Sequence, residues 1–377
     1  MKKGYFHLEG FLSWIAVTLL MTSSGCGVES NEPEPVVSNG SVSEAPVTQA
    51  VAVDPTATTR PIPTNSWVSL GLERVGDWAI AVDEIVIDPL APATLYVSTE
   101  WHGVYKSTDG GGSWHSINSG LINLNARALV MDPETSSTLY LGTDGDGVYK
   151  TTDGGQSWFK VNAGLYDPTI KALVIDPETP ANLYAGTENS GVFRSTDGGE
   201  TWNEAANGVE GTHVLSLAID PVTPTILYAG TWDGILKTTD GGRIWRKVSE
   251  IDAQVQVLVI DPNVPETLYA GTHGIVPELG GVLKSDDGGI RWKPVNSGLP
   301  VGPVFALAID PFEPHTIYAG TTTNGVYRSL DGGNTWKAFN KGLKGSYILT
   351  LAVDPFTPSI LYAGTGGDGV LTYHQEY

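Results

Sequence analysis

The chain has 377 residues, a formal net charge of −21 at pH 7 and a pI near 4.5. This acidic balance argues against nucleic acid and against anionic membrane surfaces as partners, because phosphate groups repel a negatively charged protein. The charge otherwise describes solubility and selects no partner. Since the length is large for one ordinary domain, internal repeats have to be sought before any local interpretation.

Residues 1–26 are typical of an export signal. Two lysines precede an apolar run at 11–21 that is too short to span a bilayer. Cys26 is the chain's only cysteine, and it follows a Ser-Gly pair. Small residues before a cysteine at this depth resemble a bacterial lipobox, although Ser23 stands where a lipobox usually has an aliphatic residue. We therefore expect export to the periplasm or cell exterior with a lipid anchor at Cys26; ordinary cleavage at the small residues is the alternative.

Residues 27–65 are rich in Pro, Ser, Thr, Val and acidic residues. They contain no strand-length apolar pattern beyond residues 50–54, so we expect a disordered tether. With Cys26 used for the anchor, no disulfide can form within the chain. The folded part must therefore be stabilised by packing alone.

Residues 66–377 consist of repeats. An Asp-Pro pair ends an apolar run seven times, with spacings of 44, 44, 44, 41, 49 and 44 residues by subtraction, at Asp88, Asp132, Asp176, Asp220, Asp261, Asp310 and Asp354. The third repeat contains four short strand-like runs, at 172–176, 183–187, 191–195 and 201–205. Short β-rich runs separated by Pro, Gly and Asn at this period indicate propeller blades. The sequence therefore predicts an all-β fold, a single seven-bladed β-propeller of four-stranded blades.

An eight-residue pattern, S/T-x-D-G-G-x-x-W, recurs between the third and fourth runs of the repeats. In the third repeat, Asp197 can accept hydrogen bonds from its own turn, Gly198 and Gly199 can adopt positive φ, and Trp202 can bury a large face against the sheet. We expect this hairpin to be structural. The same role is predicted for Asp109, Trp114, Asp153, Trp158, Asp197, Trp202, Asp240, Trp245, Asp287, Trp292, Asp331 and Trp336.

This pattern looks like the Asp-box of the bacterial neuraminidase repeat. The wider frame, DPxxPxxLYAGTxxGVYKSTDGGxTW, is similar to repeats of sortilin-type propellers, xyloglucanase-type glycoside hydrolases and photosystem II stability/assembly factors. The resemblance covers roughly residues 66–377. Its members include enzymes, receptors and assembly factors, so it implies a fold and decides no function. The assembly factors imply a protein partner, whereas the glycosidases imply a polysaccharide.

The two ends of the repeat region complement each other. The seventh repeat has strands at 349–354, 360–364 and 369–373 but no Asp-box after them. Residues 65–70 match the end of a box and a fourth strand, with Trp67 in the position of Trp202. We therefore expect the N-terminal strand to complete the last blade, which removes two unpaired edges.

Functional residues are expected on the face that carries the loops between second and third strands and between blades, here called the variable face. The Asp-Pro turns and boxes form the opposite, Asp-box face. Three tryptophans outside the box position map to the variable face, where they could stack on a sugar or anchor a peptide. Acidic residues on the same loops could contact a cation or sugar hydroxyls. The predicted ligand-binding residues are Trp78, Trp101, His102, Asp144, Glu188, Trp232 and Asp233. Alternatively, the aromatic residues only cover the core and the acids are solvated.

The residues of known propeller enzymes are not evident. A sialidase usually needs three converging arginines, but Arg194 and Arg328 fall on outer strands and only Arg127 lies near the start of a channel-lining strand. A glycosidase of the usual kind needs two carboxylates at a defined separation. Xyloglucanase-type enzymes form their cleft between two propellers, whereas this chain has one. No catalytic residue is therefore predicted, and the assignment as an enzyme stays open.

Three histidines, His102, His213 and His273, map to three different blades and are too scattered to predict a metal site. No cofactor is predicted. We expect a monomeric, exported, lipid-anchored and non-catalytic propeller that binds a protein partner as an assembly or interaction module and touches a membrane only through its anchor. The alternative is a polysaccharide-binding protein or a glycoside hydrolase.

Overall fold

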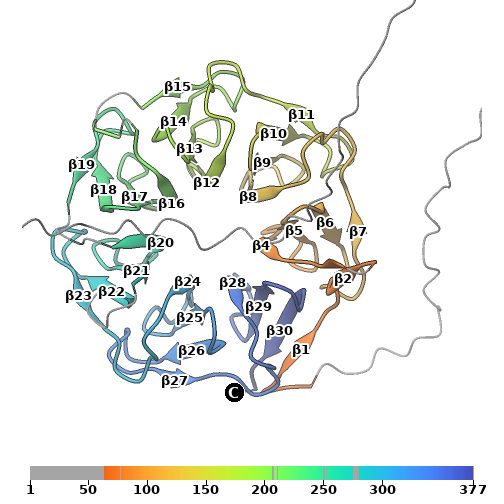
Figure 1. The fold of residues 1–377 in the computed structure, drawn as a ribbon, viewed down its shortest axis with the longest axis vertical. Helices are drawn as coiled ribbons and strands as arrows, with labels where there is room; N and C mark the ends of the chain where they lie inside the picture. Colours follow the sequence, from red (N-terminus) through yellow and green to blue (C-terminus); the bar gives the residue numbers. More distant parts are fainter. Residues whose placement is uncertain are drawn as a thin grey trace, which may run out of the picture. The chain divides into compact units, whose positions relative to one another are not determined.

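The computed structural model describes residues 63–376 apart from 77, 206–207, 210, 249–250, 252 and 275–279. Over these residues the chain forms a ring of seven four-stranded antiparallel sheets, seen end-on in Figure 1. This confirms the prediction of an all-β, seven-bladed propeller. The expected signal, the lipobox at Cys26 and the tether as far as residue 62 lie outside the described residues.

The strands occupy four positions in each blade. The innermost strands are β4 (Val82–Ile87), β8 (Ala126–Met131), β12 (Ile170–Ile175), β16 (Val214–Ile219), β20 (Gln254–Ile260), β24 (Val304–Ile309) and β28 (Ile348–Val353). The second strands are β5 (Leu95–Thr99), β9 (Leu139–Thr143), β13 (Leu183–Thr187), β17 (Leu227–Thr231), β21 (Leu268–His273), β25 (Ile317–Thr321) and β29 (Ile360–Thr365). The third strands are β6 (Gly103–Ser107), β10 (Gly147–Thr151), β14 (Val192–Ser195), β18 (Gly234–Thr238), β22 (Gly281–Ser285), β26 (Val326–Ser329) and β30 (Val370–His374).

The outermost strands are short, and one hairpin lies outside the blades. The fourth strands are β7 (His115–Ser116), β11 (Phe159–Lys160), β15 (Asn203–Glu204), β19 (Arg246–Lys247), β23 (Lys293–Pro294), β27 (Lys337–Ala338) and β1 (Trp67–Ser69). The strand expected at 201–205 is reduced to two residues because the Trp202 N–H donates to the Ala163 carbonyl of the preceding blade rather than to its own sheet. The strands β2 (Arg74–Val75) and β3 (Trp78–Ala79) form a separate hairpin that the repeat pattern did not predict.

The second strands are buried along their whole length, which explains their apolar LYAGT sequence. The glycine within this motif is required by packing between blades. A Cβ atom on Gly186 would lie 2.5 Å from the Val214 Cγ1 atom of the next blade. Hydrophobic clusters accordingly join neighbouring blades: one contains Tyr140 of the second blade together with Leu183 and Trp202 of the third. The core is therefore distributed around the ring between blades.

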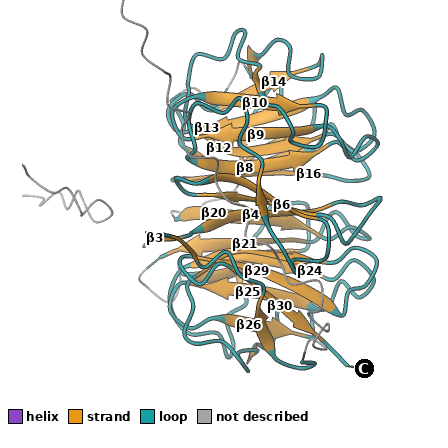
Figure 2. Ribbon diagram, turned by 90° about the vertical axis from the view of Figure 1, so that its right-hand side faces the viewer, coloured by secondary structure: helices purple, strands orange, loops and turns teal. Residues whose placement is uncertain are grey.

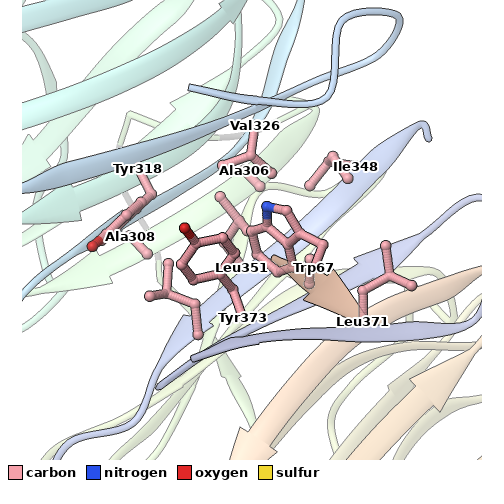
Figure 3. Packing of buried hydrophobic residues seen from close by; sticks show 11 residues of the cluster. Trp67, Ala306, Ala308, Tyr318, Val326, Ile348, Leu351, Leu371 and Tyr373 are labelled. Atoms are coloured by element: carbon pink, nitrogen blue, oxygen red, sulfur yellow. The ribbon is translucent and has the colours of Figure 1, made fainter. Parts of the chain in front are cut away.

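The ring closes as the sequence predicted. Strand β1 pairs with β30, and Trp67 lies opposite Tyr373 in this register. Figure 3 shows the Trp67 indole among buried side chains of the last two blades, including Tyr318 and Leu351. The Trp67 ring also makes an edge contact with Phe339 at 6.2 Å between ring centroids. A segment from the start of the described chain thus completes the last blade.

The two faces of the ring differ in what they carry. Figure 2 shows the ring edge-on, with β3 at one face and the end of the chain after β30 at the other. On the Asp-box face, each box contacts the Asp-Pro turn of its own blade: the Gly198 N–H donates to the Ala181 carbonyl at 2.9 Å. On the variable face, the Glu100 N–H donates to the Ala81 carbonyl at 3.0 Å, which joins a second-to-third loop to the segment entering the blade.

Candidate functional site

The variable face of the first blade carries an exposed apolar patch. The Trp78 side chain is 75% exposed and the Trp101 side chain is 66% exposed. Exposed apolar residues flank them, and the residues of this blade 1 patch are Val75, Trp78, Trp101, Ile122 and Leu124. Contiguous exposed apolar side chains on a soluble protein mark an interaction surface more often than chance.

Backbone hydrogen bonds hold the segments of the blade 1 patch together. The bond between Glu100 and Ala81 ties the loop of Trp101 to the chain three residues after Trp78. The Gly103 N–H donates to the Leu124 carbonyl at 2.8 Å, which ties the same loop to the connection between the first two blades. The patch therefore belongs to three loops fixed on a rigid sheet.

Trp101 is held in a strained backbone conformation. Its φ is +66°, in the left-handed region that favours glycine, and Gly145 occupies the corresponding position of the second blade with a φ of +106°. A non-glycine residue in this region costs roughly 1–2 kcal/mol. The strain places a large aromatic ring in solvent rather than in the core, so stability does not account for the residue. Backbone strain of this kind is concentrated at functional sites.

An ion-pair network borders the patch. Arg127 lies at its centre, with Nη1 3.1 Å from Asp83 Oδ1, Nε 3.6 Å from Asp144 Oδ2 and Nη2 4.0 Å from Glu100 Oε1. Lys171 extends the network into the third blade, because its Nζ lies 3.3 Å from Asp144 Oδ2 and 3.6 Å from Glu188 Oε2. The predicted residues Asp144 and Glu188 are thus brought together by Lys171, which contacts both carboxylates.

The network arises from a recurring irregularity of the innermost strands. Every innermost strand has a register shift at its second or third residue, and a β-bulge redirects a side chain. The bulged residues are Asp83, Arg127, Lys171, Leu215, Gln256, Phe305 and Leu349. The first three blades therefore place charges at this level of the ring, whereas most later blades place apolar side chains there.

Two carboxyl groups of β4 have raised pKa values. Burial raises the pKa of Glu84 to about 7, and the neighbouring Asp83 carboxylate also raises it, against a weak hydrogen bond donated by Thr350. Burial likewise raises the pKa of Asp83, and the Arg127 guanidinium opposes this effect. The Asp83 Oδ2 atom is buried without a hydrogen-bond partner among the described residues. The first blade thus holds carboxyl groups that titrate near neutral pH.

Two other predicted site residues, Trp232 and Asp233, lie in the fourth blade, apart from this network. The Trp232 ring stacks on His213 in the fourth blade, with centroids 4.7 Å apart, and remains 49% exposed. The Asp233 N–H donates to Thr231 Oγ1, which fixes its turn. In the first blade, His102 Nδ1 is hydrogen-bonded to the Glu100 carbonyl at 3.0 Å. No contact between described residues joins the Trp232 pair to the blade 1 patch, so the two are separate positions on the variable face.

The Asp-box residues form hydrogen bonds inside their hairpins. In the third blade, Asp197 Oδ1 accepts from the Thr201 N–H at 2.9 Å and from Ser195 Oγ at 2.8 Å. The Thr201 hydroxyl donates to Asp197 Oδ2 at 2.6 Å, and this bond together with the other two lowers the pKa of Asp197 to about 2. Gly198 and Gly199 have φ values of +72° and +86°. This geometry accounts for Ser195, Asp197, Gly198 and Gly199 of the third box without a ligand.

The box tryptophan of the third blade also forms a contact outside its own sheet. Trp202 Nε1 donates to the Val161 carbonyl of the preceding blade at 2.7 Å. On the other side of the blade, the Tyr184 hydroxyl donates to the Gly241 carbonyl in the next box at 3.1 Å. We expected Trp202 to pack against its own sheet; it also links two blades.

Sequence reasoning missed part of this face. Asp83, Glu84 and Lys171 were not selected, although the second position of the innermost strands changes from charged to apolar around the ring. Ile122 and Leu124 were not selected either. Among the described residues, no group of three or more His, Cys, Asp or Glu side chains could hold a metal ion. In the same part of the chain, no helix is long and apolar enough to cross a membrane.

Family models match parts of the repeat region. A model described as photosynthesis system II assembly factor YCF48 matches residues 212–351, and a BNR/Asp-box repeat model matches residues 193–204. The chain is a BNR/Asp-box β-propeller. No curated protein matches the sequence of this propeller significantly.

Solved structures share the fold of the propeller at low sequence identity. YCF48 bound to D1 peptide is 16% identical with a TM-score of 0.62, and the match covers 84% of this chain and 99% of that one. The GH74 enzyme of Niastella koreensis is 21% identical with a TM-score of 0.62, covering 78% of this chain and 52% of the enzyme. The extracellular domain of the one component system BT4673 from B. thetaiotaomicron is 16% identical with a TM-score of 0.62, and the match covers 80% of this chain and 39% of that one.

The extent of these matches differs between the groups. This chain spans about half the length of the three GH74 enzymes that it matches. It spans nearly the whole of the YCF48 structures. At identities below 25%, these matches show a common propeller architecture. They do not assign the activities of those proteins to this chain.

Proposed function

We propose that this protein is a non-catalytic propeller that binds a protein partner through the blade 1 patch and acts as an assembly or interaction module. The observation that carries the proposal is the pair of exposed tryptophans, Trp78 and Trp101, of which Trp101 is held in a left-handed conformation. Exposed tryptophan side chains on a rigid scaffold are typical binding anchors, because they bury a large area with few rotatable bonds.

The ion-pair network beside the patch forms a polar rim next to this apolar centre. Arg127 and Lys171 are each shared between carboxylates, so the carboxylates of Glu100, Asp144 and Glu188 outnumber the cations that they contact. A basic segment of a partner would find both aromatic faces and carboxylates at this position. An apolar centre with a charged border matches the usual anatomy of protein interfaces.

Whole-chain similarity supports a protein partner over a polysaccharide. A single propeller of the YCF48 type is matched from end to end, and that structure is described as bound to D1 peptide. The GH74 enzymes extend well beyond the part that this chain matches. A polysaccharide is the second candidate, favoured by the two tryptophans alone, since aromatic faces also stack on sugars.

We also propose export and lipid attachment at Cys26, on the basis of the apolar run at 11–21 and the small residues before the cysteine. Such an anchor would hold the ring at a membrane on its extracytoplasmic side. Metabolic labelling with a radioactive fatty acid tests this point. Incorporation should occur in the natural chain and disappear in Cys26→Ser; equal labelling of both, or of neither, would contradict it.

The partner class is tested by two assays run side by side. The full chain is used as bait in a pull-down from the native envelope and as a probe on a glycan array. We expect a discrete protein to be retained by the natural chain and lost with Trp101→Ala, and Phe159→Ala serves as a matched control for an exposed aromatic residue elsewhere. A glycan signal that is lost with Trp101→Ala, without a retained protein, would favour the polysaccharide.

A further inference from the structure

The bulged residues of the innermost strands occupy equivalent positions in all seven blades. In every blade the register shift lies opposite the same two residues of the second strand, a threonine and the residue before it. Innermost strands line the channel of a propeller, and here each begins at the variable face. The bulges therefore surround one end of the channel. This channel mouth consists of Asp83, Arg127, Lys171, Leu215, Gln256, Phe305 and Leu349, all half-buried.

The channel mouth is ionic and negatively charged over the first three blades. Within the described residues, its two cations contact the carboxylates of Asp83, Glu100, Asp144 and Glu188. Glu84 adds a fifth carboxyl group, which accepts a hydrogen bond from Thr350 at 3.5 Å. Burial raises the pKa of Asp83 and of Glu84 to about 7, yet the other three carboxylates still outnumber the two cations. This half of the mouth is therefore complementary to a positive charge.

Two buried acceptors in this region, Asp83 Oδ2 and Asn125 Oδ1, have no donor among the described residues. Asp83 accepts through its other oxygen, from Arg127 Nη1 at 3.1 Å. Asn125 is 3% exposed, and its backbone carbonyl accepts from the Asp144 N–H at 2.9 Å, so it lies beside the network. An acceptor buried without a donor destabilises the fold. A ligand with N–H donors can remove this cost, whereas an anion cannot.

Across the ring, the channel mouth is aromatic. The Phe305 ring of the sixth blade lies between His273 of the fifth blade, at 5.9 Å between centroids, and Tyr347 of the seventh, at 6.1 Å. Figure 1 shows β24, the strand of Phe305, on the opposite side of the channel from β8 and β12. Tyr347 is 41% exposed. A ligand at the mouth can thus contact charges on one side and aromatic rings on the other.

The ionic half of the mouth adjoins the blade 1 patch. Glu100 contacts Arg127 Nη2 at 4.0 Å, and it directly precedes Trp101 in the chain. A basic side chain that approaches over Trp101 meets an indole face and then carboxylates, and both attract cations. An ammonium group suits acceptors on several sides, because it is a compact charge with three rotatable donors, whereas a guanidinium group is planar and fixed.

We propose that the channel mouth binds a lysine side chain of the protein partner, with the ammonium group among Asp83, Glu100 and Asp144 and an apolar neighbour of that lysine on Phe305. This inference rests on the proposed function for the class of partner. It goes beyond that function because it names the chemical group that is recognised and a second contact surface. The blade 1 patch then supplies apolar area, and the mouth selects a basic segment.

Fluorescence anisotropy of a labelled peptide tests the mouth without the natural partner. The probe is a glycine octapeptide with one lysine and one phenylalanine three residues apart, so that the two side chains can lie up to about 10 Å apart. We expect the full chain to bind it. Replacing the lysine by norleucine should lower the affinity about tenfold, and replacing the phenylalanine by alanine should lower it about fivefold. Unchanged affinity for either control peptide, or binding of cellohexaose in place of the probe, would overturn the proposal.

Variants of the protein locate the bound peptide. Asp83→Asn and Asp144→Asn should each lower the affinity for the probe about fivefold, and Phe305→Ala should do the same. Asp286→Asn is the matched control, because Asp286 is an ion-paired acid on the Asp-box face, 2.9 Å from Lys284 Nζ. Circular dichroism checks that each variant is folded, and Asp144→Asn carries the test if Asp83→Asn is not. Equal affinities of Asp144→Asn and the natural chain would contradict the site.

The two proposals fail in different ways. If the pull-down retains a protein but the probe peptide does not bind, the channel mouth is not the anchor and the proposed function stands. If the peptide binds with the expected losses but no protein is retained, the mouth is a site for lysine side chains and the proposed function is wrong.

Discussion

Trp67 Nε1 donates a hydrogen bond of 2.7 Å to the carbonyl oxygen of Phe339, 272 residues further along the chain. The same indole is buried in the core of the last two blades (Figure 3). One side chain from the first strand therefore holds the ring closed by packing and by hydrogen bonding. This bond at the ring closure is equivalent to the hydrogen bond that Trp202 Nε1 donates to the Val161 carbonyl between the second and third blades.

The closure predicts a sharp difference between two truncations. Deleting residues 1–62 should leave the free energy of unfolding nearly unchanged, because every described contact is retained. Deleting residues 1–70 also removes β1 with Trp67 and should cost at least about 3–5 kcal/mol, the typical loss for a buried tryptophan. Thermal unfolding followed by circular dichroism measures both. Equal melting temperatures would show that β1 does not close the ring.

The link between blades predicts different effects for two equivalent tryptophans. Trp202→Phe removes the hydrogen bond to Val161, whereas Trp245 Nε1 is buried without a partner among the described residues. Both substitutions lose a similar amount of buried surface. Trp202→Phe should therefore be more destabilising than Trp245→Phe by about 1 kcal/mol, the net value of a neutral hydrogen bond. Urea unfolding compares them, and equal losses would contradict the role of the bond.

The raised pKa of Glu84 predicts a pH-dependent stability. The carboxyl group titrates at about 7 in the folded chain, above its ordinary value of 4.5, so the folded state binds the proton more tightly. Stability from this group is present below pH 4.5 and is lost as the pH rises towards 7. Glu84→Gln should thus stabilise the protein increasingly between pH 5 and 8, by up to about 3 kcal/mol. Over this range the Asp-boxes stay ionised.

Urea unfolding of both chains at several pH values provides the measurement. Glu178→Gln serves as the control, since Glu178 is exposed on the opposite face. A difference between Glu84→Gln and the natural chain that does not change with pH would contradict the assignment.

The strain at Trp101 predicts that binding and stability can be separated. Trp101→Gly removes the indole and relieves the left-handed conformation, so it should raise the free energy of unfolding by about 1 kcal/mol. Trp101→Ala removes the same ring but keeps most of the strain. If Trp101→Gly destabilises the protein, the ring contributes to the core and the patch is structural.

The fold was largely predictable because the sequence pattern of each strand recurs in successive repeats, and these copies can be compared with one another. Asp-Pro spacing and the box fixed the number of blades, and the incomplete last repeat fixed the closure. The hairpin β2–β3 was not predictable, since Arg74 to Ala79 occurs once and has no repeat to compare with. The short fourth strands were also missed, because the bond from the Trp202 N–H to the preceding blade is not encoded in local strand patterns.

The candidate site was less predictable than the fold. Exposure of Trp78 and Trp101 followed from their absence from the repeat pattern, but the ion pairs of Arg127 depend on which blades are neighbours and on the bulge that redirects the side chain. Asp144 and Glu188 were chosen as acidic loop residues of the same face, without Lys171, the cation that contacts both.

Site-specific photo-crosslinking in the native envelope tests the central proposal most directly. A photoreactive phenylalanine analogue is placed at Trp78 or Trp101 of the blade 1 patch, and at Phe159 on an exposed outer strand as the control. We predict a discrete protein adduct from positions 78 and 101 and none from position 159. Adducts only from position 159, or no adduct from either patch position, would contradict the account of this face as the partner-binding surface.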